Sequence, residues 1–370
     1  MKVLVVGAGI AGAAVGMYLH RQGHQVRIVD AAAEPHAGGY LLQLDRTAQG
    51  IARELGLGRL IQDTTLETPQ ITLLPWRRRR GSIRLSSFRV ARRGDFVTAV
   101  MQCAAQEVEV ELGIALTSLE HVAGGVIARF GDGTQEQFDL IVGADGLRST
   151  VRGLMATNDQ PIYKNGHLTV WANLPVEAGS SPRALLGWDK SMTLQMFPYP
   201  DGASELALVS VRTPHGQLTP EEGHQTITRA FREWGFNREA EMLAQFDPEG
   251  LRIMSFAQAR TPAWSSRRVV LVGDAAHCID PMSGLGAHGA FFGARNLDRA
   301  LQNTRSLSGA LRNYERRTRP FTEMAQRLTA GLLEGLTADR PKHVGIGLKD
   351  LARAAIWRTQ LRKPDLSKAV

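Results

Sequence analysis

The sequence predicts an α/β fold, and three features along the chain support this prediction. The chain begins with a short β-branched run, a glycine-rich turn and a helical segment, and a second β-branched run follows. Period-two runs typical of strands occupy the region from about residue 160 to residue 260. Beyond residue 285 the apolar residues recur at helical spacing. A chain of 370 residues is long enough for two domains, or for one large α/β body with an inserted module.

The N-terminal segment has the full pattern of a dinucleotide-binding βαβ unit. Residues 2–6 (KVLVV) are typical of a buried parallel strand, the loop 7–12 (GAGIAG) follows at once, and a helix extends to Gly23. A second strand ends at Asp30, about twenty residues past the loop, which makes the G-x-G-x-x-G spacing a Rossmann-type motif. Unpaired N–H groups at the helix start would face a pyrophosphate, and Asp30 would accept hydrogen bonds from a ribose. Contacts to a dinucleotide, either NAD or FAD, are predicted at Gly7, Gly9, Ile10, Ala11, Gly12, Asp30 and Ala31.

A second glycine run with the same spacing, residues 284–289 (GLGAHG), lacks that context. The strand-like run RVVLV ends about a dozen residues before it, and no strand ending in an acid follows at the required distance. We therefore interpret it as the start of a helix over residues 287–302. The N-terminus of this helix would face a different part of a ligand.

Three segments together resemble one protein family. The run RVVLVGDAAHCIDPMSGLGAHGA is similar to the segment of FAD-dependent aromatic hydroxylases (group A flavoprotein monooxygenases, para-hydroxybenzoate hydroxylase-like) in which a Gly-Asp pair contacts the flavin ribityl chain. Residues 139–152 (DLIVGADGLRSTVR) resemble the Asp-Gly motif of that family, and residues 90–96 (VARRGDF) resemble the segment in which an arginine before a helix reaches FAD. The resemblance implies further FAD contacts at Arg93 (with Arg92 as the alternative), Asp145, Gly273, Asp274, Pro281, Gly284, Leu285, Gly286 and Ala287.

The chain departs from the family pattern at two positions. Gly293 stands where many relatives have an acid, and His288 where many have Asn or Ser. We expect His288 on the helix surface rather than facing the flavin. The helical pattern continues beyond residue 300, and a break is expected near Pro320.

The resemblance also implies a division of the chain. An FAD-binding domain is expected from residues 1–158 and 259–335, a sheet-based substrate domain from residues 68–90 and 159–258, and a basic C-terminal helix from residues 336–370. Four residues on the predicted strands are candidates to cover a substrate pocket, although a simple core or surface position is the favoured explanation for each: Trp171, Gln195, Phe197 and Tyr199. The sequence identifies no catalytic base and no metal-ligand spacing.

The implied function is a single-component FAD-dependent monooxygenase. NADPH or NADH would dock transiently near residues 145–152 and reduce the flavin, and O2 would then hydroxylate or epoxidise an aromatic or polyketide-like molecule through a flavin hydroperoxide. Alternatives are an FAD-dependent dehydrogenase or reductase, a non-redox flavoprotein that acts as a cyclase or sequesters a ligand, and an NAD-dependent dehydrogenase.

Composition limits the expected binding partners and the expected cellular compartment. The net charge is +8, but its densest basic run, residues 75–85, lies between two strand-like segments and is interpreted as a hairpin tip, with no nucleic-acid-binding motif beside it. Two cysteines are too few for a disulfide framework, which favours the cytoplasm. No window has the length of an apolar membrane span, so no stable membrane association is expected. A monomer and a homodimer are both open.

Overall fold

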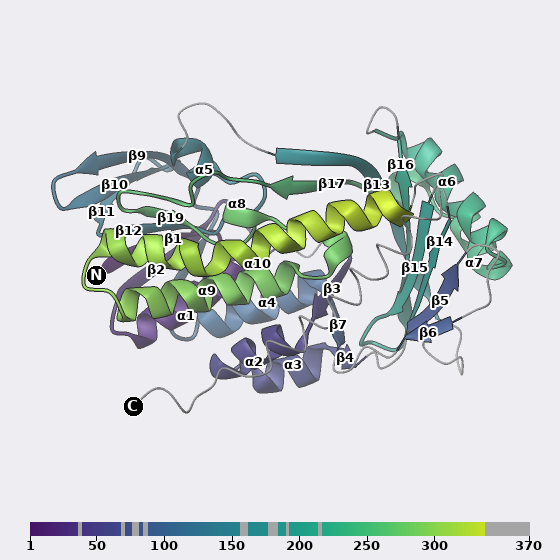
Figure 1. Cartoon of the computed structure of the whole chain (residues 1–370), viewed down its shortest axis with the longest axis horizontal. Coiled ribbons are helices and arrows are strands. Elements are labelled where there is room, and N and C mark those ends of the chain that lie inside the picture. The colour runs from purple at the N-terminus through teal and green to yellow at the C-terminus, as the bar shows by residue number, and fades with distance from the viewer. Residues whose placement is uncertain are drawn as a thin grey trace.

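The computed structural model describes residues 1–35, 39–67, 71–75, 81–83, 88–155, 162–176, 184–189, 192–213 and 217–336. A layered α/β part and a second, mainly antiparallel sheet stand side by side (Figure 1). The predicted terminal helix beyond residue 336 and the tip of the basic hairpin lie outside the described residues.

The α/β part is built on a six-stranded sheet in the order β18-β19-β12-β1-β2-β8. All neighbours are parallel except β18 and β19. Its strands are β1 (Lys2–Val6), β2 (Gln25–Asp30), β8 (Glu109–Leu112), β12 (Leu140–Gly143), β18 (Ser265–Ser266) and β19 (Val269–Leu271). The main helices packed on it are α1 (Ile10–Arg21), α4 (Arg93–Ala104), α9 (Gly286–Gln302) and α10 (Leu307–Leu336).

Smaller elements surround this sheet. One three-stranded sheet contains β3 (Leu41–Leu44), β7 (Arg89–Arg92) and β4 (Leu66–Glu67), and another contains β9 (Leu116–Val122), β10 (Gly125–Phe130) and β11 (Gln135–Phe138). The short helices are α2 (Arg46–Glu54), α3 (Gly58–Thr64), α5 (Thr150–Met155) and α8 (Asp274–His277).

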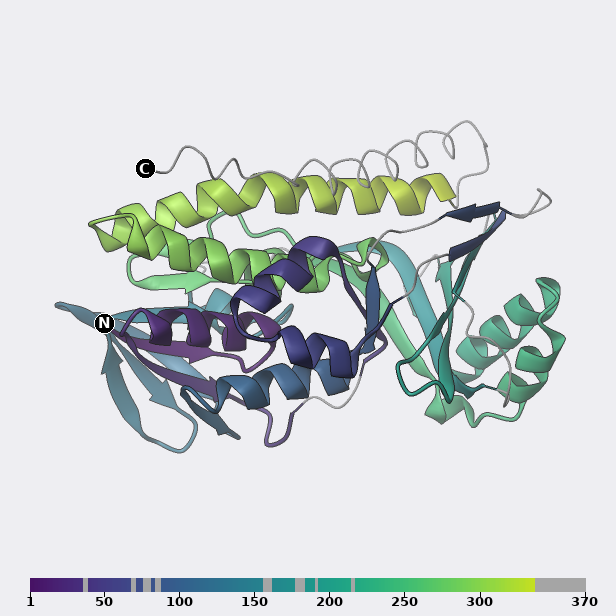
Figure 2. The same ribbon diagram turned by 90° about the horizontal axis from the view of Figure 1, so that it is seen from below.

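The second part is a seven-stranded sheet in the order β17-β13-β16-β15-β14-β5-β6. Its strands are β5 (Ile71–Pro75), β6 (Gly81–Ile83), β13 (Ile162–Pro175), β14 (Leu185–Trp188), β15 (Met192–Pro198), β16 (Ser204–Arg212) and β17 (Arg252–Ala259). Helices α6 (Pro220–Glu233) and α7 (Asn237–Ala244) cover its outer face, as Figure 2 shows. The opposite face turns toward β3 and β7 and shares an apolar cluster with them.

The sequence predictions of local structure are confirmed at most elements. The βαβ unit, the hairpin strands β5 and β6, and the helix that begins near residue 286 are all present. Helix α6 begins with a capping box in which Thr219 and Glu222 satisfy each other's backbone N–H groups. The predicted break at Pro320 is wrong, because α10 runs through it without interruption. Buried neighbours such as Phe321 hold the helix in place, and this packing outweighs the lost backbone bond.

Both cysteines, Cys103 and Cys278, are free thiols. Within the part of the chain that the structure describes, no helix is long and apolar enough to cross a membrane.

Candidate functional site

The sequence motifs meet at one edge of the six-stranded sheet. Strands β1, β12 and β19 are adjacent and parallel, so the loops after Val6, Gly143 and Leu271 leave the sheet at the same carboxyl end. In doubly wound sheets this edge is where ligands bind.

The first loop shows why its glycines are needed. Gly7 has a φ of +106°, and a Cβ there would lie 2.5 Å from the carbonyl oxygen of Ala144. A Cβ on Gly12 would lie 1.8 Å from the carbonyl oxygen of Gly7. No atom lies within 4 Å of a Cβ built on Gly9, so open space faces this residue. The first helical bond of α1 runs from Ala13 N–H to Gly9 C=O, which leaves the N–H groups of Ile10, Ala11 and Gly12 outside helical pairing.

Asp30 lies at the end of β2, next to the first glycine loop. Its carboxylate accepts the N–H of Ala8 at 2.8 Å and the N–H of Ala32 at 2.9 Å. An open pocket extends from here. It is lined by Ala8, Gly9, Asp30, Ala32, Glu34, Pro35, Arg93, Val97, Met101 and Leu112. Ala32 is among these lining residues, and the predicted Ala31 is its exposed neighbour in the chain.

The two candidate arginines point to different parts of the molecule. Arg93 lines the pocket and packs against Gly39, and its charge acts on Asp274. Arg92 turns to the seven-stranded sheet instead. Its Nη2 lies 2.8 Å from Oδ2 of Asp201, and its guanidinium lies 4.4 Å from the centre of the Tyr199 ring.

The Asp-Gly segment, residues 139–152, is held by hydrogen bonds within itself and to α8. Asp145 accepts the hydroxyl of Ser149 at 2.5 Å and the N–H of Val151 at 3.0 Å, so its carboxylate is occupied at the start of α5. Burial raises the pKa of Asp145. Arg152 is 1% exposed and donates from Nη1 to the carbonyl oxygen of Ala275 in α8 at 2.8 Å.

The Gly-Asp pair lies directly after β19. Gly273 has a φ of +62°, and a Cβ there would lie 2.7 Å from Cβ of Ala11 in α1. Asp274 begins α8 and is accessible to solvent. The protein crowded around this carboxyl still raises its pKa, and Arg93 opposes that effect.

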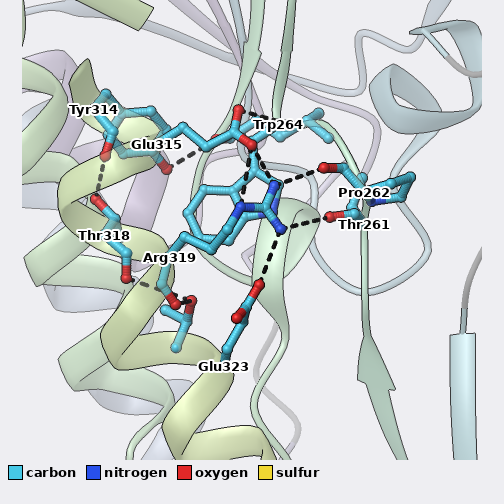
Figure 3. Close-up of polar contacts among 10 residues, drawn as sticks. Thr261, Pro262, Trp264, Tyr314, Glu315, Thr318, Arg319 and Glu323 are labelled. Carbon is cyan, nitrogen blue, oxygen red and sulfur yellow. Dashed lines mark hydrogen bonds and ion pairs between the residues drawn. The ribbon is translucent and has the colours of Figure 1, made fainter. Parts of the chain in front are cut away.

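Helix α10 binds residues 261–264, which precede β18, as Figure 3 shows. Arg319 stacks over Trp264 and donates to the carbonyl oxygens of Thr261 and Pro262 and to the carboxylates of Glu315 and Glu323. Tyr314 donates to the carbonyl oxygen of Leu271 at 2.9 Å. The end of β19 is therefore tied to α10.

The second glycine run starts α9 without a side-chain cap. Pro281 opens the short turn before it, and Gly284 (φ +62°) leaves room for the side chain of Gln43. The side chains of Leu285 and Ala287 are buried, so only their backbone can meet a ligand. Gly286 is exposed, with no atom within 4 Å of a Cβ built on it.

The expected position of His288 is wrong. Its side chain is buried at 1% exposure, because it stacks on Phe321 and its Nδ1 lies 2.8 Å from Oδ2 of Asp45. Gly293 lies on the same helix and packs against the Gly-Asp segment, where a Cβ on it would lie 3.7 Å from the backbone N of Gly273. A Cβ there would lie 3.5 Å from Nε2 of His277 and 3.2 Å from Cγ1 of Val272.

The predicted substrate residues share the inner face of the seven-stranded sheet. Trp171 and Gln195 flank Leu208 in one row across three strands. Phe197 is buried, and Tyr199 is fully buried with its hydroxyl bonded to Asn173 at 2.9 Å, which gives Tyr199 a packing role. Sequence reasoning missed Tyr40, whose ring meets Trp171 edge-on at 6.3 Å and whose hydroxyl lies in the electrostatic field of Arg93 and Asp274.

These features fit an FAD molecule laid along the sheet edge. Open space at Gly9 and unpaired N–H groups suit a pyrophosphate, Asp30 suits a ribose, and the exposed carboxylate of Asp274 suits a hydroxylated chain. The open backbone at Gly286 suits the edge of a flavin ring. Among the described residues, no group of His, Cys, Asp and Glu could hold a metal ion.

The fold and the site thus define an FAD-binding flavoprotein. A family model described as an FAD binding domain matches residues 1–329. The chain belongs to the FAD-dependent aromatic hydroxylase family of flavin monooxygenases, with FAD as its cofactor.

Similar proteins carry related names. Kynurenine 3-monooxygenase from Salinispora arenicola is 28% identical over 93% of this chain and 82% of its own length. A flavin-dependent monooxygenase from Legionella longbeachae is 28% identical over 80% of this chain and 78% of its own. The crystal structure of Klebsiella pneumoniae HpxO with FAD and uric acid is 19% identical and covers 98% of this chain and 92% of its own, with a TM-score of 0.81. At that identity the last match shows the fold alone.

Proposed function

We propose that the protein is a single-component monooxygenase that takes electrons from NADPH or NADH and inserts one oxygen atom of O2 into an aromatic or polyketide-like molecule. The observation that supports this most is the shared edge of β1, β12 and β19, where the open glycine loops, Asp30 and Asp274 converge. The inner face of the seven-stranded sheet reaches Tyr40, whose ring contacts Trp171 and whose hydroxyl lies in the electrostatic field of Arg93 and Asp274.

Bound FAD supplies the storage of two electrons and the transfer of an oxygen atom to the substrate. In the balanced reaction, NAD(P)H, a proton, O2 and substrate give NAD(P)⁺, water and oxygenated substrate. We propose that the chain's part is to hold FAD through residues 7–12, Asp30, Arg93 and Asp274. Tyr40 and Trp171 would separate the reacting atoms from bulk water.

We assign the substrate domain to the seven-stranded sheet with α6 and α7, and the FAD-binding domain to the rest of the described chain. Relatives named for kynurenine, 6-hydroxynicotinate and aurachin C support a ring-containing substrate. Fold alone does not choose among them.

The nicotinamide nucleotide is proposed to dock near residues 145–152 by way of Arg148. Arg148 is exposed, whereas the guanidinium of Arg152 is buried on backbone carbonyls. Arg148→Ala should raise KM for NADPH or NADH about two- to fivefold and leave kcat unchanged, because an exposed charge contributes up to about 1 kcal/mol. Arg59→Ala, on the exposed surface of α3, is the matched control. Equal KM in all three proteins contradicts this docking site.

The decisive assay for the reaction is anaerobic reduction followed by labelled oxygen. NADPH or NADH should bleach the bound flavin, with or without a candidate substrate, and reoxidation under 18O2 should add one labelled atom to a product. Bleaching with substrate oxidation and no incorporated label supports the dehydrogenase or reductase instead. A flavin that neither nucleotide bleaches supports the non-redox alternative.

A further inference from the structure

The first turn of α9 is anchored by a buried pair of polar side chains, His288 and Asp45. Nδ1 of His288 lies 2.8 Å from Oδ2 of Asp45, and the other oxygen of Asp45 accepts the N–H of Ala48 at 2.9 Å. Asp45 is the N-cap of α2, so one carboxylate joins the first turns of two helices.

The surroundings of the imidazole fix its orientation. The ring stacks on Phe321 of α10 with 4.3 Å between centroids and 18° between planes, and Phe292 lies 5.6 Å away. Its Nε2 is buried without a hydrogen-bond partner among the described residues. Burying a polar atom unpaired costs about 1–3 kcal/mol, so the histidine is not explained as a simple stabilising contact.

The same turn has backbone N–H groups outside helical pairing. The first helical bond runs from Gly289 N–H to Leu285 C=O at 2.9 Å, which leaves the N–H groups of Gly286, Ala287 and His288 outside helical pairing. Gly286 is exposed, and no atom lies within 4 Å of a Cβ built on it. His288 therefore carries both a backbone N–H outside helical pairing and the imidazole that contacts Asp45.

We propose that His288 and Asp45 are positioning residues for the flavin. They hold the free N–H groups of the α9 turn at the ring edge, where reduced flavin carries more negative charge than oxidised flavin. The pair thereby makes binding of the reduced form more favourable than binding of the oxidised form. This inference rests on the proposed placement of FAD at Gly286.

The test measures the midpoint potential of bound FAD and its Kd in the oxidised form. In His288→Asn and in Asp45→Asn, the affinity of reduced relative to oxidised FAD should fall three- to tenfold, equal to a potential about 14–30 mV lower. The double variant should match the single variants, because the two side chains act through one contact. Thr318→Val is the matched control: it removes the buried bond from Asn296, about two turns further along α9, and should leave the potential unchanged.

The outcomes separate the inference from the function on which it rests. Wild-type potentials in folded His288→Asn and Asp45→Asn, or additive shifts in the double variant, overturn the positioning role. A wild-type protein that binds no FAD overturns the proposed site itself. Asp45→Asn conserves shape, so it provides a folded test protein if the histidine variant is unstable.

Discussion

Replacement of Asp30 tests the flavin site at its proposed adenosine end. Its carboxylate already accepts two backbone N–H groups, from Ala8 and Ala32, and its free lone pairs face the pocket. A hydrogen bond to a charged group is worth about 1.5–3 kcal/mol, and about 1.4 kcal/mol changes Kd tenfold. Loss of one ribose contact in Asp30→Ala should therefore raise the Kd for FAD about 10- to 150-fold.

The assay is a titration of the apoprotein with FAD, followed by flavin fluorescence. Asp30→Glu is the control, because it keeps the carboxylate and should stay within about fivefold of wild type. Asp30→Ala should also lose about 1–3 kcal/mol of unfolding free energy, because the two backbone N–H groups lose their acceptor. A folded Asp30→Ala protein with wild-type affinity for FAD would refute the ribose assignment.

Three further predictions concern other parts of the site. Gly286→Val should weaken FAD binding at least tenfold, because its methyl groups enter the open space proposed for the flavin, and it should leave the unfolding midpoint unchanged. Gly289→Ala, with ordinary contacts around its Cβ, is the control. Unchanged turnover in Gly286→Val would contradict the placement of α9. Arg319→Ala should lower the free energy of unfolding, measured in urea, by about 2–3 kcal/mol, because it removes the contacts of Arg319 in Figure 3. A loss under about 0.5 kcal/mol, roughly that of a surface substitution, would contradict a stabilising role for Arg319. Burial lowers the pKa of His277 to about 4 from 6.5, so the unfolded state takes up the proton first as the pH falls. The free energy of unfolding should therefore fall by about 3 kcal/mol from pH 6.5 to 4. His277→Gln should lack this part of the decline, and identical pH curves for the two proteins would contradict the role of His277.

The sequence predicted what depends on local pattern. The βαβ unit, the glycine loop and the start of α9 follow from residues close together in the chain, so periodicity and turn chemistry suffice. That the segments after β12 and β19 join the first loop follows from adjacent parallel strands, which the family resemblance anticipated.

The parts that escaped prediction depend on contacts distant in sequence. The sequence around His288 does not indicate its contact with Asp45, which lies 243 positions away, so the local pattern places His288 at the helix surface. Tyr40 looks like an ordinary loop residue until the fold brings Trp171 against it. Pro320 signals a break locally, but packing around Phe321 decides the outcome.

The FAD site is tested most directly by the visible spectrum of the purified chain after incubation with FAD and removal of the unbound cofactor. The protein should be yellow, with flavin absorption bands and one FAD for each chain. A folded protein that stays colourless would contradict the placement of FAD along β1, β12 and β19.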